Sequence, residues 1–321
     1  MNRQLKTKFL SLHVSWLVIC YLLIFVPLTD SRAQLKAQFS AQTNIFPKDK
    51  TVIDLTVAEL RQYCPSELLN LSPNPDQDEL NPLLVRIGER VGAFFRLFSN
   101  TACREYLLMQ RLGYNGGVED WNIRYFNYLM FYSPGESLPS LEEYRTDREN
   151  RPIGQDATEG FYVTSGYVCH NLHFHPGFQH ASDFRYLGRQ ISGSRAHIIA
   201  FAQKLNQEGL RIGFTDIYTG ESTRLPVQGI ACIDADTYQI LRLYINLLPA
   251  GNSSSLKEQT TDIKFSETQF ENAKKRLWMP QEITIITTIG GIVFRNYHRY
   301  SEYKLFTIES DTKFDRPKPR N

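Results

Sequence analysis

Two adjacent glycines near the C-terminus, Gly290 and Gly291, constrain the fold of this chain more than any other feature. They separate Ile283–Ile289 from Ile292–Tyr300, two runs rich in β-branched and aromatic residues. A two-residue hairpin turn needs positive φ at both central residues, which glycine adopts without strain, and such flanking runs are typical of strands. The pair therefore predicts a β-hairpin near the end of the chain.

Most of the remaining chain also has the composition of strands. The segments expected to form them are 101–112, 123–132, 141–146, 161–169, 198–203, 210–218, 227–233, 238–248 and 262–270. One segment differs: from Pro82 to Phe98 the apolar residues recur every three or four positions, which predicts an amphipathic helix. The fold class expected is mainly β (α+β), with a curved antiparallel sheet or half-barrel packed on one or more helices.

Segment 238–248 shows how we expect the two faces of the sheet to differ. Strict alternation puts Leu241, Leu243, Ile245 and Leu247 on one face. The other face would then be aromatic and amphipathic, and its candidate ligand-binding residues are Tyr238, Ile240 and Tyr244.

The N-terminus has the pattern of a secretory signal peptide. Basic residues precede a short apolar run, and small residues at Ser31 and Ala33 suit cleavage after Ala33. We expect a signal peptide at 1–33, a polar linker with a short helix at 34–80, one β-rich half-barrel domain at 81–310 and a disordered tail at 311–321. An uncleaved membrane anchor is the alternative for the first segment.

The charge balance and the cysteine content limit which binding partners and which disulfides we expect for this chain. The chain has 36 Lys and Arg against 34 Asp and Glu, and removal of 1–33 takes away mainly basic residues. The near-neutral remainder gives no reason to expect binding to nucleic acid. The cysteines beyond residue 33 either form up to two disulfides, in pairings that the sequence does not rank, or are buried as small apolar side chains; they are Cys64, Cys103, Cys169 and Cys232.

The sharpest local motif is a histidine cluster from His170 to His175, with His180 close behind it. If the strand expected at 161–169 continued, His173 and His175 would share a face, and His180 follows closely, so these three are the candidate metal ligands. The alternative is a strand-end or loop role, because Pro176 indicates that a strand ends there.

Catalytic and cofactor motifs are missing from the sequence. It has no Gly-x-Ser-x-Gly, no Gly-x-Gly-x-x-Gly and no P-loop. Asp234 and Asp236 fit the turn before segment 238–248 better than acid–base chemistry. We therefore expect no catalytic residues and no cofactor.

Several strings resemble a known group of proteins. Phe184–Gln190, Gly229–Arg242, Leu277–Pro280 and Phe294–Phe306 resemble segments of uncharacterised secreted bacterial proteins, which are themselves distantly similar to periplasmic lipoprotein carriers of the LolA and LolB type. The resemblance implies a curved sheet that wraps helices and an apolar concavity for acyl chains.

Together these observations lead to three functional hypotheses. The first is a secreted or periplasmic, non-enzymatic binding or carrier protein for a lipid, a lipidated protein or another amphipathic ligand. The second is a metal-dependent hydrolase or metal-binding protein that uses the histidine cluster. The third is an envelope module that binds a protein partner.

Overall fold

The computed structural model of this chain divides into two compact units, Met1–Gln42 and Thr43–Asn321. It describes residues 46–47, 49–133, 140–151, 153, 161, 164, 166–191, 195–207, 209–215, 222–248 and 256–306. The predicted signal peptide at 1–33 and the predicted tail at 311–321 lie outside these residues. No helix within the described ranges combines the length and the apolar character needed to cross a membrane.

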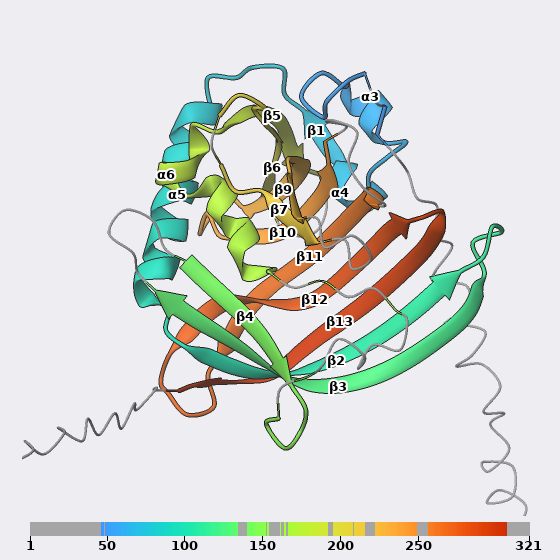
Figure 1. The fold of residues 1–321 in the computed structure, drawn as a ribbon. Coiled ribbons are helices and arrows are strands. Elements are labelled where there is room, and N and C mark those ends of the chain that lie inside the picture. The colour runs from blue at the N-terminus through green and yellow to red at the C-terminus, as the bar shows by residue number, and fades with distance from the viewer. Residues whose placement is uncertain are drawn as a thin grey trace, which may run out of the picture. The chain divides into compact units, whose positions relative to one another are not determined.

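The second unit is built on an antiparallel sheet of eleven strands, in the order β1-β5-β6-β9-β10-β11-β12-β13-β2-β3-β4. Figure 1 shows its long strands bending as they run side by side. The strands of this sheet are β1 (Leu71–Pro73), β2 (Thr101–Leu112), β3 (Val118–Ser133), β4 (Ser140–Thr146), β5 (Ser182–Gln190), β6 (Ala196–Gln203), β9 (Val227–Asp234), β10 (Ile240–Leu247), β11 (Leu256–Gln269), β12 (Arg276–Ile289) and β13 (Ile292–Leu305). A separate hairpin pairs β7 (Ile212–Thr215) with β8 (Ser222–Leu225). The predicted fold class, a mainly antiparallel curved sheet with a few helices, is confirmed.

The helices are few and mostly short. Their bounds are α3 (Val57–Leu60), α4 (Ser66–Leu69), α5 (Leu80–Leu97), the 3₁₀ helix η2 (Val168–Phe174) and α6 (Pro176–Gln179). Figure 1 shows α5 and α6 beside one another along one side of the sheet. Since α5 is the one long helix in the described ranges, it supplies most of the helical apolar surface.

The hairpin and the aspartate turn that the sequence predicted are both present. Gly290 and Gly291 have φ values of 56° and 85°, and Ile289 pairs with Ile292 across them. At the β9–β10 turn the Asp234 side chain accepts hydrogen bonds from the backbone N–H of Asp236 and Thr237. Asp234 therefore shapes this turn.

Helix α5 packs on the inner face of the sheet, as its periodicity predicted. Its apolar stripe is buried in the main core together with side chains of β6, β9, β10, β11 and β12. The stripe comprises Leu83, Leu84, Ile87, Val91, Phe94 and Phe95. Helix α5 therefore packs against part of the inner face of the sheet.

The expected division of faces along β10 is confirmed from Leu243 to Leu247 and is wrong before Leu243, because of a β-bulge. The register with β9 shifts between Ile240 and Arg242, and an extra residue in a strand reverses the alternation beyond it. As a result Ile240 packs in the main core with Leu243, whereas Tyr244 packs in a second core on the opposite face.

That second core corrects the prediction of a polar linker at 34–80. Over the described part of this segment, α3, α4 and β1 cover the outer face of β5, β6, β9 and β10. The side chains that these elements and the loops around them contribute to the second core are Phe46, Val52, Leu55, Leu60, Cys64, Leu68, Leu69 and Leu71. Hydrogen bonds fix the cover, for example from Val52 N to Gln228 Oε1 (2.8 Å). Both faces of this half of the sheet are thus buried.

Between β4 and β6 the prediction differs most from the structure. The strand expected at 161–169 is absent from its described residues, where η2 begins at Val168 instead. Segment 182–190, which was not among the expected strands, is strand β5, and it pairs with β1 on one side and β6 on the other. The four cysteines are free, and three of them are buried apolar side chains, while Cys169 is half-buried.

Candidate functional site

The histidine cluster lies in helical turns that pack against α5, not on a strand. His170 and His173 lie in η2, 7 % and 2 % exposed, with ring centroids 5.9 Å apart. Burial lowers the pKa of His170 to about 4, and burial, followed by the charges of His170 and Arg211, lowers that of His173 further below its usual value. Both rings are therefore neutral near pH 7. The expectation that His173 and His175 share a strand face is wrong, because the backbone turns between them.

The other two histidines have separate surroundings. His175 begins α6, and its Nδ1 accepts a hydrogen bond from Gly177 N (3.2 Å). His180 follows the end of α6. Within the ranges that the structure describes, no three His, Cys, Asp or Glu side chains gather as ligands for a metal ion.

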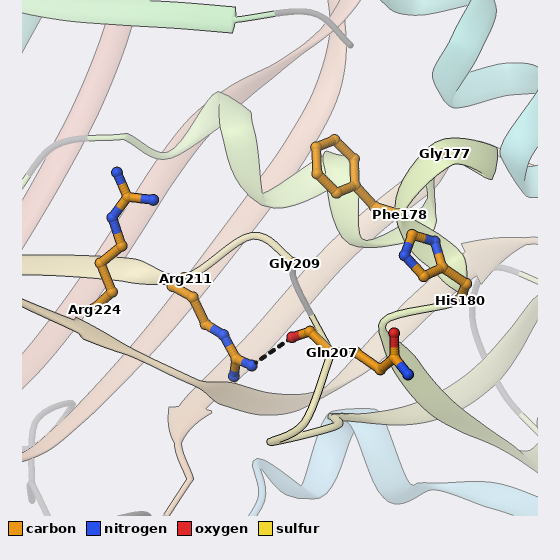
Figure 2. A pocket seen from close by; sticks show the side chains of 7 residues that line it. All are labelled: Gly177, Phe178, His180, Gln207, Gly209, Arg211 and Arg224. Carbon is orange, nitrogen blue, oxygen red and sulfur yellow. Dashed lines mark hydrogen bonds between the residues drawn. The ribbon is translucent and has the colours of Figure 1, made fainter. Parts of the chain in front are cut away.

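A pocket of about 560 Å³ opens where α6 faces the β7–β8 hairpin (Figure 2). Gly177 and Phe178 belong to α6, His180 follows it, Gln207 and Gly209 lie between β6 and β7, Arg211 precedes β7, and Arg224 lies in β8. Its volume falls within the range of small-molecule sites, about 300–1,000 Å³.

One wall of the pocket is cationic. Arg224 pairs with Gly213 across the hairpin, Arg211 directly precedes β7, and both arginines line the pocket. Arg211 Nη2 donates to the carbonyl oxygens of Lys204 and Gln207, each at 2.9 Å. No carboxylate lines the pocket among the residues that the structure describes.

The opposite wall is apolar. Phe178 packs against the main core, and so do Leu210 and Ile212, which flank Arg211 in the sequence. In Figure 2 the Phe178 ring lies on the far side of the pocket from the Arg211 guanidinium. The pocket therefore offers a hydrocarbon surface and a cationic surface to the same ligand.

Of the residues that the sequence singled out, only His180 lines this pocket. Ile240 and Tyr244 are buried on opposite faces of the sheet, and Tyr238 lies against Arg86, whose guanidinium is 4.9 Å from its ring centroid. The two arginines and Phe178 were missed. No local pattern marks them, since their proximity depends on how β7 pairs with β8 and how α6 packs.

A second polar group is closed to solvent. The Glu105 carboxylate accepts hydrogen bonds from Arg145 Nε (2.6 Å), His298 Nδ1 (2.7 Å) and the Tyr300 hydroxyl (2.8 Å). Burial opposes its ionisation, but Arg145 and His298 outweigh burial and lower the pKa of Glu105 to about 2. Because the side chains of Glu105 and His298 are 0 % exposed, this cluster ties β2, β4 and β13 together and has no access to a substrate.

No protein family model matches the chain, and no curated protein matches it. Two solved structures are similar to it. One is a DUF1329 family protein from Desulfovibrio piger, 12 % identical, with a TM-score of 0.38 over 73 % of this chain and 95 % of that one. The other is a LolA superfamily protein from Nitrosomonas europaea, also 12 % identical, with a TM-score of 0.35 over 70 % of this chain and 94 % of that one.

Proposed function

We propose that this chain is an exported, secreted or periplasmic, non-enzymatic binding or carrier protein for an amphipathic ligand such as a lipid or a lipidated protein. The observation that carries the proposal is the pocket beside α6, which has a volume of about 560 Å³. In it Phe178 faces a polar wall. An amphipathic ligand has the same division into an apolar and a polar part.

The surroundings of the pocket support binding over catalysis. Burial and neighbouring charges shift the pKa values of Glu105, His170 and His173 strongly, and none of these residues lines the pocket. The pocket instead borders the main core through Phe178, so an acyl chain entering it would exchange water for hydrocarbon.

Native mass spectrometry of the purified full chain tests the proposal directly. We expect additional peaks at masses above that of the protein, and we expect these peaks to disappear on delipidation. The organic extract should contain a lipid. Displacement of the neutral dye Nile red by monoolein gives the affinity of the delipidated protein for an apolar chain.

A pair of variants locates the binding. Phe178→Ala should weaken monoolein binding, because the variant loses the ring that forms the apolar wall. Phe131→Ala is the matched control: this ring is half-buried on β3, against Tyr144 and Phe306, and does not line the pocket. The carrier proposal fails if monoolein does not displace the dye and the purified protein contains no lipid. Such a result would favour a protein partner.

A further inference from the structure

We propose that the pocket selects amphiphiles whose head group is an anion, a carboxylate or a phosphate, and that Arg211 and Arg224 bind it. This inference rests on the proposed function and specifies the ligand class for the same pocket. It starts from the two arginines that line the pocket, Arg211 just before β7 and Arg224 in β8.

Arg211 is held in place and has a free donor. Its Nη2 is committed to the carbonyl oxygens of Lys204 and Gln207, which fixes the plane of the guanidinium. Its Nη1 is buried and has no hydrogen-bond partner. A buried donor without a partner costs free energy, and an oxyanion is the strongest acceptor for a guanidinium N–H. The unmade hydrogen bond thus points to a missing anion.

The space around the arginines is suited to a head group. A Cβ placed on Gly213, which lies opposite Arg224 in the hairpin, would meet nothing within 4 Å. No acid lines the described pocket to neutralise the guanidinium groups. Asp183 is already paired with Lys204, at 3.3 Å. Two guanidinium groups that none of the described lining residues neutralises, next to open space, favour a carboxylate or phosphate, whose oxygens match their fork of donors.

The apolar wall argues for an anion that carries a chain. Phe178 faces the arginines across the pocket, and it packs on the main core. A free inorganic anion would leave this surface in contact with water, whereas an acyl chain would cover it.

The test compares ligands that share a chain and differ in the head. Oleate, monoolein and inorganic phosphate each compete with Nile red for the delipidated full chain, at low and high salt. We expect oleate to bind roughly tenfold more tightly than monoolein, since one carries a charge and the other does not. The difference should shrink at high salt, and phosphate alone should not displace the dye.

Variants assign the effect to the arginines. Arg224→Gln should reduce the oleate-to-monoolein affinity ratio roughly tenfold, and it leaves the backbone contacts of Arg211 in place. Arg211→Gln is the second variant. Arg90→Gln removes the same charge from the exposed side of α5, outside the pocket, and should leave the ratio unchanged.

The outcomes separate this inference from the proposed function. Equal displacement by oleate and monoolein, or an unchanged ratio in both pocket variants, overturns the anionic head group and leaves the carrier proposal standing. Displacement by phosphate as strong as by oleate makes the pocket a small-anion site and overturns the inference. If neither oleate nor monoolein displaces the dye, the carrier proposal fails and this inference fails with it.

Discussion

Replacing Phe95 by alanine should destabilise the protein by about 3–5 kcal/mol, the usual cost of removing a fully buried phenyl ring. Phe95 is 2 % exposed, and its ring centroid lies 5.0 Å from that of Phe94 and 6.5 Å from that of Tyr132. Val91→Ala, one turn earlier at 5 % exposure, removes two carbon atoms worth about 0.8 kcal/mol each. A domain of ordinary stability, about 5–15 kcal/mol, would be left marginal by both changes together. Urea unfolding followed by far-UV circular dichroism measures each free energy.

The same helix provides the matched control. Val85 is 59 % exposed on the solvent side of α5, so Val85→Ala makes the change of Val91→Ala without a cavity. It should be neutral or slightly stabilising, because alanine is the better helix former by up to about 0.7 kcal/mol. The burial argument is refuted if the Val91 and Phe95 double variant unfolds at the urea concentration of the wild type and binds no more hydrophobic dye. It is also refuted if Val85→Ala costs as much as Val91→Ala.

Four further results are expected. The folded-state pKa of His170, about 4, lies below its usual 6.5, so the unfolded chain takes up a proton first as the pH falls. His170 alone should therefore lower the free energy of unfolding by about 3 kcal/mol from neutral pH to about pH 4, and the drop should be smaller by this amount in His170→Asn; equal profiles for the two proteins would contradict this. Arg145→Met should cost about 3–5 kcal/mol because it leaves the Glu105 charge buried without its ion partner, and adding Glu105→Gln should recover part of that loss in urea unfolding. Gly188 has a φ of 136° and its Cβ would collide with the Ser72 carbonyl oxygen, so Gly188→Ala should release β1 from β5, seen as faster exchange of the Asn74 amide, which donates to Leu187 O; unchanged protection would count against it. N-terminal sequencing of exported protein should begin at Gln34, and a chain that begins at Met1 would contradict the predicted cleavage.

Local patterns predicted the parts of the fold that depend on local chemistry. The turn at Gly290-Gly291 needs only two residues that tolerate positive φ, and α5 shows its buried side through its own periodicity. Strand β2 was predicted with its observed bounds, Thr101–Leu112. In each case the neighbouring residues in the sequence decide the conformation.

The errors all depend on contacts between distant parts of the chain. The bulge in β10 is set by its register with β9, so the placement of Ile240 on the same face as Leu243 could not follow from alternation alone. The segment before residue 80 appeared to be a linker, because its apolar residues have no regular period. They are nevertheless buried against the outer face of the sheet. The pocket arginines meet only through hairpin pairing and the packing of α6, which no spacing in the sequence records.

The order of the strands also determines when the sheet can be assembled. The β2–β4 meander is joined to β9–β13 through the pairing of β13 with β2, and the hydrogen bond between Glu105 and His298 spans 193 positions. Until β13 has been synthesised, β2 has no partner on that side and exposes an unpaired edge. Such non-local pairing folds slowly, and open strand edges promote aggregation. The chain therefore depends on being complete, and on being held apart from its own copies, before the two halves of its sheet can join.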